Sequence, residues 1–207
     1  MRYLAAFLAI LATACAHASA ATRVDQYMSG LSTWSADFEQ SISDAKGKPT
    51  RRASGHLYLQ RPGKFRWDYR VPSEQLVLAD GKKLWFYDAD LAQANVRELD
   101  ASLASTPAVL LSSGSAVSAE FDITALPEDD GLEWFQLRPK REGGDFLAAR
   151  VGFRKGELVR MLLADKLNQV TRVDFSRAVR DQPLAADLFT FTPPAGVDVI
   201  GHAPGEQ

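Results

Sequence analysis

The sequence holds a single cysteine, Cys15, only three histidines and no block of lysine or arginine along its 207 residues. A lone cysteine excludes an intramolecular disulfide, and so few cysteines and histidines leave no spacing typical of a metal site. Phosphate binding needs clustered cations, so a formal net charge of -2 with both signs interspersed argues against a nucleic-acid-binding protein. The apolar run Leu4–Ala14 is too short for a transmembrane helix, which takes about 20 apolar residues.

Motifs of catalysis are missing as well. No nucleophile stands in an elbow or triad pattern, and Gly143-Gly144 lies between predicted strands, without the strand-to-helix context of a phosphate loop. His56 and His202, the two histidines beyond the N-terminal segment, are far apart in the sequence. We therefore predict that the protein is not an enzyme and holds no metal and no cofactor.

Residues 1–20 have the pattern of a secretory signal peptide. Arg2 gives a positive start, Leu4–Ala14 supplies a short apolar stretch, and Ala18-Ser19-Ala20 fits the small-x-small cleavage motif. We predict cleavage before Ala21, which leaves residues 21–207 as one exported domain without cysteine.

Cys15 offers an alternative to simple cleavage, because a lipoprotein signal also ends at a cysteine. Such a signal places a leucine-led triplet before the cysteine, whereas Ala12-Thr13-Ala14 precedes Cys15 and Leu11 stands one position too early. Lipidation at Cys15 is therefore the weaker interpretation.

Hydrophobic residues make up 46% of the whole chain, which suits one globular domain. The exported part opens with a predicted helix. The apolar residues with helical spacing are Val24, Tyr27, Met28 and Leu31. Thr22 and Asp25 have the spacing of a capping box, and Gly30 is placed to end the helix. The pattern predicts a helix whose apolar face is turned to the core.

Beyond this helix the apolar period changes to two, which indicates β-strands. Alternating residues occur first at Trp34, Ala36, Phe38 and Ile42, then at Leu57 and Leu59, and then at Phe65, Trp67 and Tyr69. Further strands are predicted at Gln75–Ala79, Leu84–Tyr87, Ala94–Leu99, Glu120–Thr124, Leu132–Leu137, Phe146–Phe153, Leu158–Leu163, Val170–Phe175 and Phe189–Thr192. Tight turn signals such as Pro62-Gly63 and Asp130-Gly131 separate them, which favours one large antiparallel sheet.

One later helix is expected to interrupt the strands, at residues 105–112. Thr106-Pro107 is a good helix start, and Ser112-Ser113-Gly114 would end the helix after barely two turns. So short a helix must dock on something, and a twisted sheet with one apolar face needs a cover. We therefore predict an α+β fold, mainly β, in which one curved antiparallel sheet forms an unclosed half-barrel covered by short helices.

Several short motifs follow one another in a specific order. Gly55 to Asp88 contains a strand, Arg61-Pro62, the Phe65-x-Trp67 strand, Asp80-Gly81 and an aromatic strand, and Phe38-x-Gln40 precedes them. Downstream come Thr106-Pro107 with Leu110-Leu111 and then Phe189–Pro194. This order resembles the LolA family of outer-membrane lipoprotein carriers, in which the last two motifs correspond to the lid helix and the closing strand. The resemblance covers nearly all of the chain after residue 20.

The resemblance implies a monomeric periplasmic carrier that accepts lipoproteins released from the inner membrane and shields their acyl chains in an apolar cavity. The implied partners are a LolCDE-type inner-membrane transporter and a LolB-type outer-membrane receptor. Two alternatives stay open: a lipid-anchored LolB-like receptor, which acylation at Cys15 would favour, and a lipid-binding sensor of the RseB type. The sensor proteins carry a further domain for which this chain has no room.

Arg61 is the sharpest candidate residue. Strand alternation places it on the same face as Leu57 and Leu59, at the rim of an apolar interior. The resemblance implies that Arg61 holds the lid shut over the empty cavity, with several donors for main-chain acceptors. The remaining predicted cavity and lid residues are Phe65, Trp67, Ala108, Val109, Leu110 and Leu111.

Overall fold

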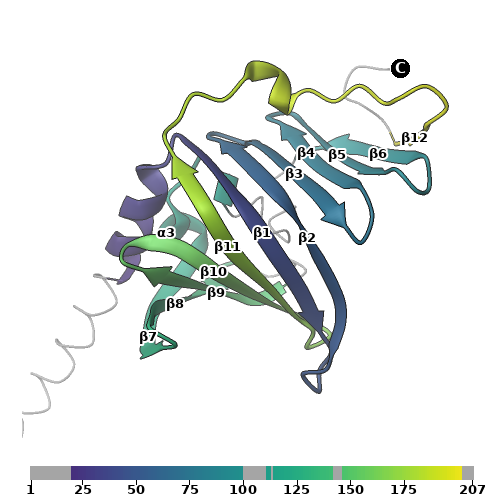
Figure 1. The fold of residues 1–207 in the computed structure, drawn as a ribbon. Helices are drawn as coiled ribbons and strands as arrows, with labels where there is room; N and C mark the ends of the chain where they lie inside the picture. The colour runs from purple at the N-terminus through teal and green to yellow at the C-terminus, as the bar shows by residue number, and fades with distance from the viewer. Residues whose placement is uncertain (1–19, 100–110, 113, 142–145, 202–207) are drawn as a thin grey trace, which may run out of the picture.

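The computed structural model describes residues 20–99, 111–112, 114–141 and 146–201. Within these residues, one strongly curved sheet forms an unclosed half-barrel, as predicted (Figure 1). The strands of its first half are β1 (Thr33–Ser43), β2 (Pro49–Gln60), β3 (Lys64–Val71), β4 (Gln75–Asp80), β5 (Lys83–Asp88) and β6 (Gln93–Glu98). Those that follow are β7 (Phe121–Asp129), β8 (Leu132–Pro139), β9 (Phe146–Arg154), β10 (Glu157–Asp165), β11 (Val170–Arg180) and β12 (Asp198–Ile200).

The strand order is β12-β6-β5-β4-β3-β2-β1-β11-β10-β9-β8-β7. Neighbouring strands are antiparallel, except that β12 runs parallel to β6. The pairing of β1 with β11 joins two antiparallel meanders into one sheet. The ends of the sheet are β12 and β7, and β7 contains Pro127 inside a register irregularity between Leu126 and Asp129.

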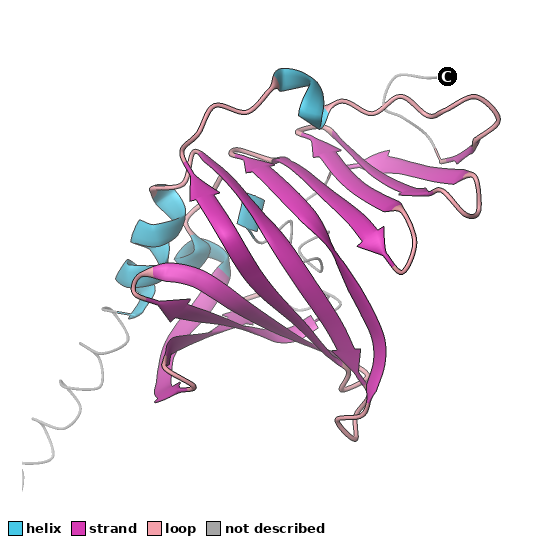
Figure 2. Cartoon of the chain, viewed as in Figure 1, coloured by secondary structure: helices cyan, strands magenta, loops and turns pink. Residues whose placement is uncertain are grey.

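The concave face of the sheet carries the main apolar core. In β1 the buried residues are Trp34, Ala36 and Phe38, which alternate with partly exposed ones, as the period-two pattern predicts. In contrast, Ile42 is only partly buried, because it lies towards the far end of the strand. Figure 2 shows the N-terminal helix on the open side of the curved sheet.

That helix covers residues 20–29 and then turns at Gly30, whose N–H donates to the Gln26 oxygen at 3.1 Å. The predicted apolar stripe is buried in the core: Val24, Tyr27, Met28 and Leu31. The predicted capping box is wrong. Thr22 lies inside the helix, and Asp25 accepts hydrogen bonds from the backbone N–H and hydroxyl of Ser118 instead of capping its own helix.

Two further helical turns were not expected. A short helix, α3 (Val117–Glu120), precedes β7, so the strand predicted from Glu120 begins one residue later. A 3₁₀ turn, η2 (Ala186–Phe189), follows β11. Both are single turns, too short to produce a helical apolar period.

The strand predicted at Phe189–Thr192 is wrong. Phe189 ends η2, and the residues that follow cross the outer face of the sheet without joining it. The Phe191 ring lies against Trp85 and Tyr87, with centroids 5.4 and 5.3 Å away. Apolar alternation therefore comes here from an extended strap over a sheet face, and the strand that ends the sheet is β12.

Candidate functional site

Four of the predicted cavity residues are brought together on the concave face. Leu57 pairs with Trp67, and Leu59 pairs with Phe65, across β2 and β3. All four side chains are buried in one apolar cluster. Alternation along each strand aims them to the same side, so the wall next to the β2–β3 turn is apolar over two successive rows. Their contact with acyl chains stays a prediction.

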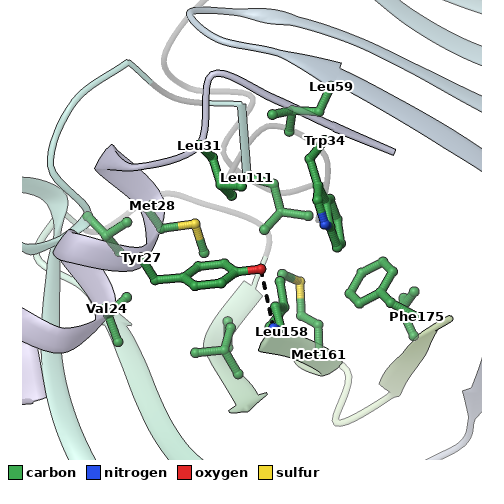
Figure 3. Close-up of a cluster of buried hydrophobic side chains, with 14 of the residues drawn as sticks. Val24, Tyr27, Met28, Leu31, Trp34, Leu59, Leu111, Leu158, Met161 and Phe175 are labelled. Carbon is green, nitrogen blue, oxygen red and sulfur yellow. Dashed lines mark hydrogen bonds between the residues drawn. The ribbon is translucent and has the colours of Figure 1, made fainter. Parts of the chain in front are cut away.

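The cluster joins this wall to the N-terminal helix. Figure 3 shows Met28 and Leu31 from the helix region and Trp34 and Phe175 from the sheet pointing into one apolar space. Leu111 points into the same space and is 1% exposed. Of the predicted lid residues, Leu111 is thus placed in the core, whereas Ala108, Val109 and Leu110 lie outside the described residues.

Arg61 lies directly after β2, at the rim of this apolar wall. Its guanidinium donates to the main-chain oxygen of Met28, in the N-terminal helix, and to that of Ser115 at 3.4 Å. The main-chain N–H of Arg61 donates to the Ser32 oxygen at 2.9 Å. Partial burial lowers the pKa of Arg61 from its usual value, although a guanidinium remains charged at neutral pH. One side chain therefore ties β2 to the helix and to the segment before α3.

The turn that follows Arg61 makes a second connection to that segment. The Gly63 N–H donates to the Ser112 oxygen at 2.9 Å. Gly114 packs so tightly on Pro62 that a Cβ on Gly114 would stand 2.9 Å from the Pro62 Cβ. The β2–β3 turn, together with Arg61 before it, therefore contacts Ser112, Gly114 and Ser115 in one region.

The N-terminal helix is anchored on its other side to the second half of the sheet. The Tyr27 hydroxyl accepts a hydrogen bond from the Leu158 N–H at 3.2 Å, drawn in Figure 3, and it donates to Glu157 Oε2 at 3.4 Å. Burial raises the pKa of Tyr27 to about 12. The Tyr27 ring meets Phe153 edge-on, and the Arg180 guanidinium lies over it, 4.6 Å from the centroid.

A surface cleft of about 580 Å³ lies where these connections meet. The N-terminal helix forms one side with Asp25 and Ser29, and Arg61, Pro62 and Ser115 form the other. This cleft marks the seam between the helix and the β2–β3 turn.

Two interior features were not singled out by the sequence. Trp34 is buried beside the predicted wall, paired with Leu59 across β1 and β2. Tyr69 donates from its hydroxyl to Gln40 Oε1 at 3.1 Å, and burial raises the pKa of Tyr69 to about 12. Both residues belong to predicted strands, so alternation indicated which face of the sheet each side chain is on. The partners themselves lie on other strands, and the sequence near Trp34 and Tyr69 carries no signal for them.

One charged cluster lies on the outer face, because Asp37 alternates with the buried residues Ala36 and Phe38 and pairs with His56. His56 Nδ1 is 2.5 Å from Asp37 Oδ1, and Arg177 pairs with the same carboxylate. These hydrogen bonds, that of His56 first, hold the pKa of Asp37 below its ordinary value. Among the described residues, no group of three His, Cys, Asp or Glu side chains is placed to hold a metal ion, and no helix is long and apolar enough to cross a membrane.

Comparisons with known proteins agree with this architecture. Residues 29–192 match the family described as outer membrane lipoprotein carrier protein LolA. A protein from Nitrosomonas europaea named outer-membrane lipoprotein carrier protein is 42% identical over 184 residues, which cover 88% of this chain and 89% of that protein. One of the same name from Chromobacterium violaceum is 41% identical over 196 residues, covering 95% and 94% of the two chains.

Solved structures support the fold at low sequence identity. A crystal structure of a LolA superfamily protein from Nitrosomonas europaea aligns with a TM-score of 0.50 at 12% identity, covering 85% of this chain and 98% of that one. An uncharacterized conserved protein from Thermus thermophilus aligns with a TM-score of 0.52 at 14% identity, covering 86% and 94%.

Proposed function

This chain belongs to the LolA family of outer-membrane lipoprotein carrier proteins, and from that premise we propose that it carries acylated lipoproteins across the periplasm with their acyl chains in its concave interior. The observation that carries the proposal is the apolar wall of the concave face, with Leu57, Leu59, Phe65 and Trp67 side by side and Arg61 at its rim.

The energetics of lipid transfer explain why a shielded interior is needed. Burying one methylene is worth roughly 0.8 kcal/mol, so a single long acyl chain represents on the order of 10 kcal/mol. A lipoprotein with such chains neither leaves a bilayer unaided nor diffuses bare through water. A curved apolar sheet with a movable cover would give the chains a substitute for the bilayer.

We assign Arg61 the role of a latch on the empty carrier. Its hydrogen bonds to the Met28 and Ser115 oxygens hold the N-terminal helix and the segment before α3 against the end of β2. Entering acyl chains would have to break these bonds, which offsets part of the free energy of apolar burial. The affinity for cargo would therefore stay moderate enough for onward transfer without further energy.

The route to and from the carrier follows from the same energetics. An energy-consuming transporter of the LolCDE type would load it at the inner membrane, and a receptor of the LolB type would accept the cargo at the outer membrane. The carrier would act as a monomer after removal of residues 1–20, starting at Ala21.

Native mass spectrometry of the exported protein, purified without detergent, tests this proposal. We expect a chain that starts at Ala21 with no acyl group of its own and that carries acylated lipoprotein when a transporter has loaded it. A chain that starts at an acylated Cys15 would instead indicate a lipid-anchored receptor. A chain that starts at Ala21 but takes up no lipoprotein from inner membranes with an active transporter would contradict the carrier function.

A further inference from the structure

Two indole N–H groups on the interior wall have no hydrogen-bond partner within the described part of the chain. Trp34 is 1% exposed and Trp67 is 3% exposed. The Nε1 atoms of both are buried without an acceptor among the described residues. Buried polar groups in folded proteins are nearly always hydrogen-bonded, and an unmade bond is costly. Two such donors on one wall therefore point to a function beyond packing.

The two tryptophans lie on the part of the concave face already assigned to cargo. Trp34 on β1 pairs with Leu59, and Trp67 on β3 pairs with Leu57, so the two rings flank β2 in successive rows. Figure 3 draws the Trp34 ring pointing into the same apolar space as Leu111 and Phe175. The indoles thus border the interior rather than the outer surface.

Other buried donors of the same sheet have partners within the protein. The Trp134 Nε1 group donates to the Asp129 oxygen at 3.1 Å. On the concave wall itself, Tyr69 donates to the Gln40 amide oxygen. The fold can therefore supply an acceptor where one is needed. A phenylalanine at position 34 or 67 would fill much of the same apolar space without leaving an N–H unsatisfied.

We propose that Trp34 and Trp67 donate hydrogen bonds to the ester or amide carbonyl oxygens of an acylated ligand, an inference that rests on the proposed carrier function. A hydrocarbon chain offers no acceptor, but the carbonyl that joins each acyl chain to its head group does. In apolar surroundings such a bond is stronger than in water. The ligand would reach the indoles by displacing the side chains that cover them; Leu111 lies beside Trp34 (Figure 3).

A matched pair of ligands separates carbonyl recognition from apolar burial. Dioctanoylglycerol carries two ester carbonyls, and dioctylglycerol is the ether that lacks them. The indole N–H resonances of the full exported chain, which has four tryptophans, report each donor separately once they are assigned. We expect the Trp34 and Trp67 resonances to move downfield with the ester, as a hydrogen bond forms, and not with the ether.

Conservative variants then test the energetics. Trp34→Phe and Trp67→Phe should each weaken ester binding by about two- to tenfold and leave ether binding nearly unchanged, the worth of one hydrogen bond. The control Trp134→Phe removes an indole on the other face and should weaken neither. If a variant fails to fold, the resonances of the unaltered chain still decide the matter.

The outcomes test carbonyl recognition separately from the proposed carrier function. If both glycerolipids bind equally well and neither indole resonance moves downfield with the ester, carbonyl recognition is wrong and the carrier function stands. An equal loss of ester and ether affinity in the variants would likewise contradict carbonyl recognition, because it would mean that Trp34 and Trp67 contribute apolar contact alone. If neither lipid binds the unaltered chain, carbonyl recognition is wrong, and the carrier function is decided separately by the loading of lipoprotein from inner membranes.

Discussion

The guanidinium of Arg61, just past the end of β2, donates a hydrogen bond to the main-chain oxygen of Met28 in the N-terminal helix. The last carbonyls of a helix lack partners within the helix, and its C-terminal end carries a partial negative charge. A cation with several donors therefore suits this position better than any neutral side chain. The contact spans two elements that the chain does not connect directly.

Replacing Arg61 with leucine should turn the carrier into a trap for its cargo. Arg61→Leu removes the donors to Met28 and Ser115 and adds apolar surface at the rim. The closed, empty state is then less stable relative to the carrier with bound cargo. We expect labelled lipoprotein to load but to pass to a LolB-type receptor at least several-fold more slowly than from the unaltered carrier. A transfer assay with purified components measures this rate.

The matched control is Arg51→Leu, at the exposed other end of β2. It makes the same chemical change away from the helix and should transfer cargo at the normal rate. Release of cargo from the Arg61→Leu variant at the normal rate would contradict the role of Arg61 as a latch.

Tyr27→Phe should destabilise the protein by about 1–3 kcal/mol, because it leaves the buried Leu158 N–H without its acceptor. Urea unfolding followed by circular dichroism measures the loss. Tyr58→Phe is the control, since Tyr58 lies on the outer face with its ring against His56. Equal stabilities of the two variants would mean that the hydroxyl of Tyr27 does not anchor the helix.

Stability should fall at alkaline pH through Tyr27 and Tyr69. Burial raises the pKa of each phenol from 10.0 to about 12, so the folded state favours the protonated form. This contribution is fully present below the unfolded pKa and is lost as the pH rises from about 10 towards 12. Each phenol can add a slope of up to about 1.4 kcal/mol per pH unit in that window.

The free energy of unfolding in urea, measured between about pH 9 and pH 11, gives that slope. The double variant Tyr27→Phe, Tyr69→Phe keeps every other titrating group and should show a shallower decline. Parallel declines in the two proteins would assign the alkaline loss to other groups.

Gly55→Ala should prevent stable folding. An added Cβ would lie 1.8 Å from the Asp68 oxygen and 3.0 Å from the Phe38 ring, in the middle of the β1–β2–β3 sheet. We expect a loss of more than about 3 kcal/mol, typical of severe overpacking with backbone displacement. Soluble yield and thermal unfolding measure it.

Gly47→Ala provides the comparison for that substitution. Nothing lies within 4 Å of its added Cβ, and only its positive φ of 78° opposes alanine, which costs of the order of 1 kcal/mol. A Gly55→Ala protein as stable as Gly47→Ala would contradict the close approach of β2 and β3.

The half-barrel could be predicted because its signals are local. Leu57, Leu59, Phe65 and Trp67 alternate with polar residues, and alternation fixes which face each side chain takes. The same rule misassigned Phe189–Thr192, because an extended strap across a sheet face produces the same alternation as a strand within it. A local pattern predicts to which side a side chain points, but it does not predict whether the segment joins a sheet or packs across one.

The contacts of the site could be predicted only in part. Alternation and the family resemblance placed Arg61 at the rim, but its acceptors are main-chain oxygens, which any residue type supplies. Asp25 illustrates the opposite failure: its spacing from Thr22 predicted a local cap, whereas its partner Ser118 is 93 residues away. Such long-range bonds leave no periodic trace in the sequence.

An open sheet exposes its two margins to other copies of the chain, and those margins are poor templates for strand addition. Pro127 deprives β7 of one N–H and sits in a register irregularity, followed by the exposed acids Glu128 and Asp129. On the other margin, β12 is only three residues long. Short, bulged and charged margins discourage the polymerisation that a long flat one would invite. The sheet can therefore stay unclosed, as bulky acylated cargo would require, without copies of the chain polymerising through its edge strands.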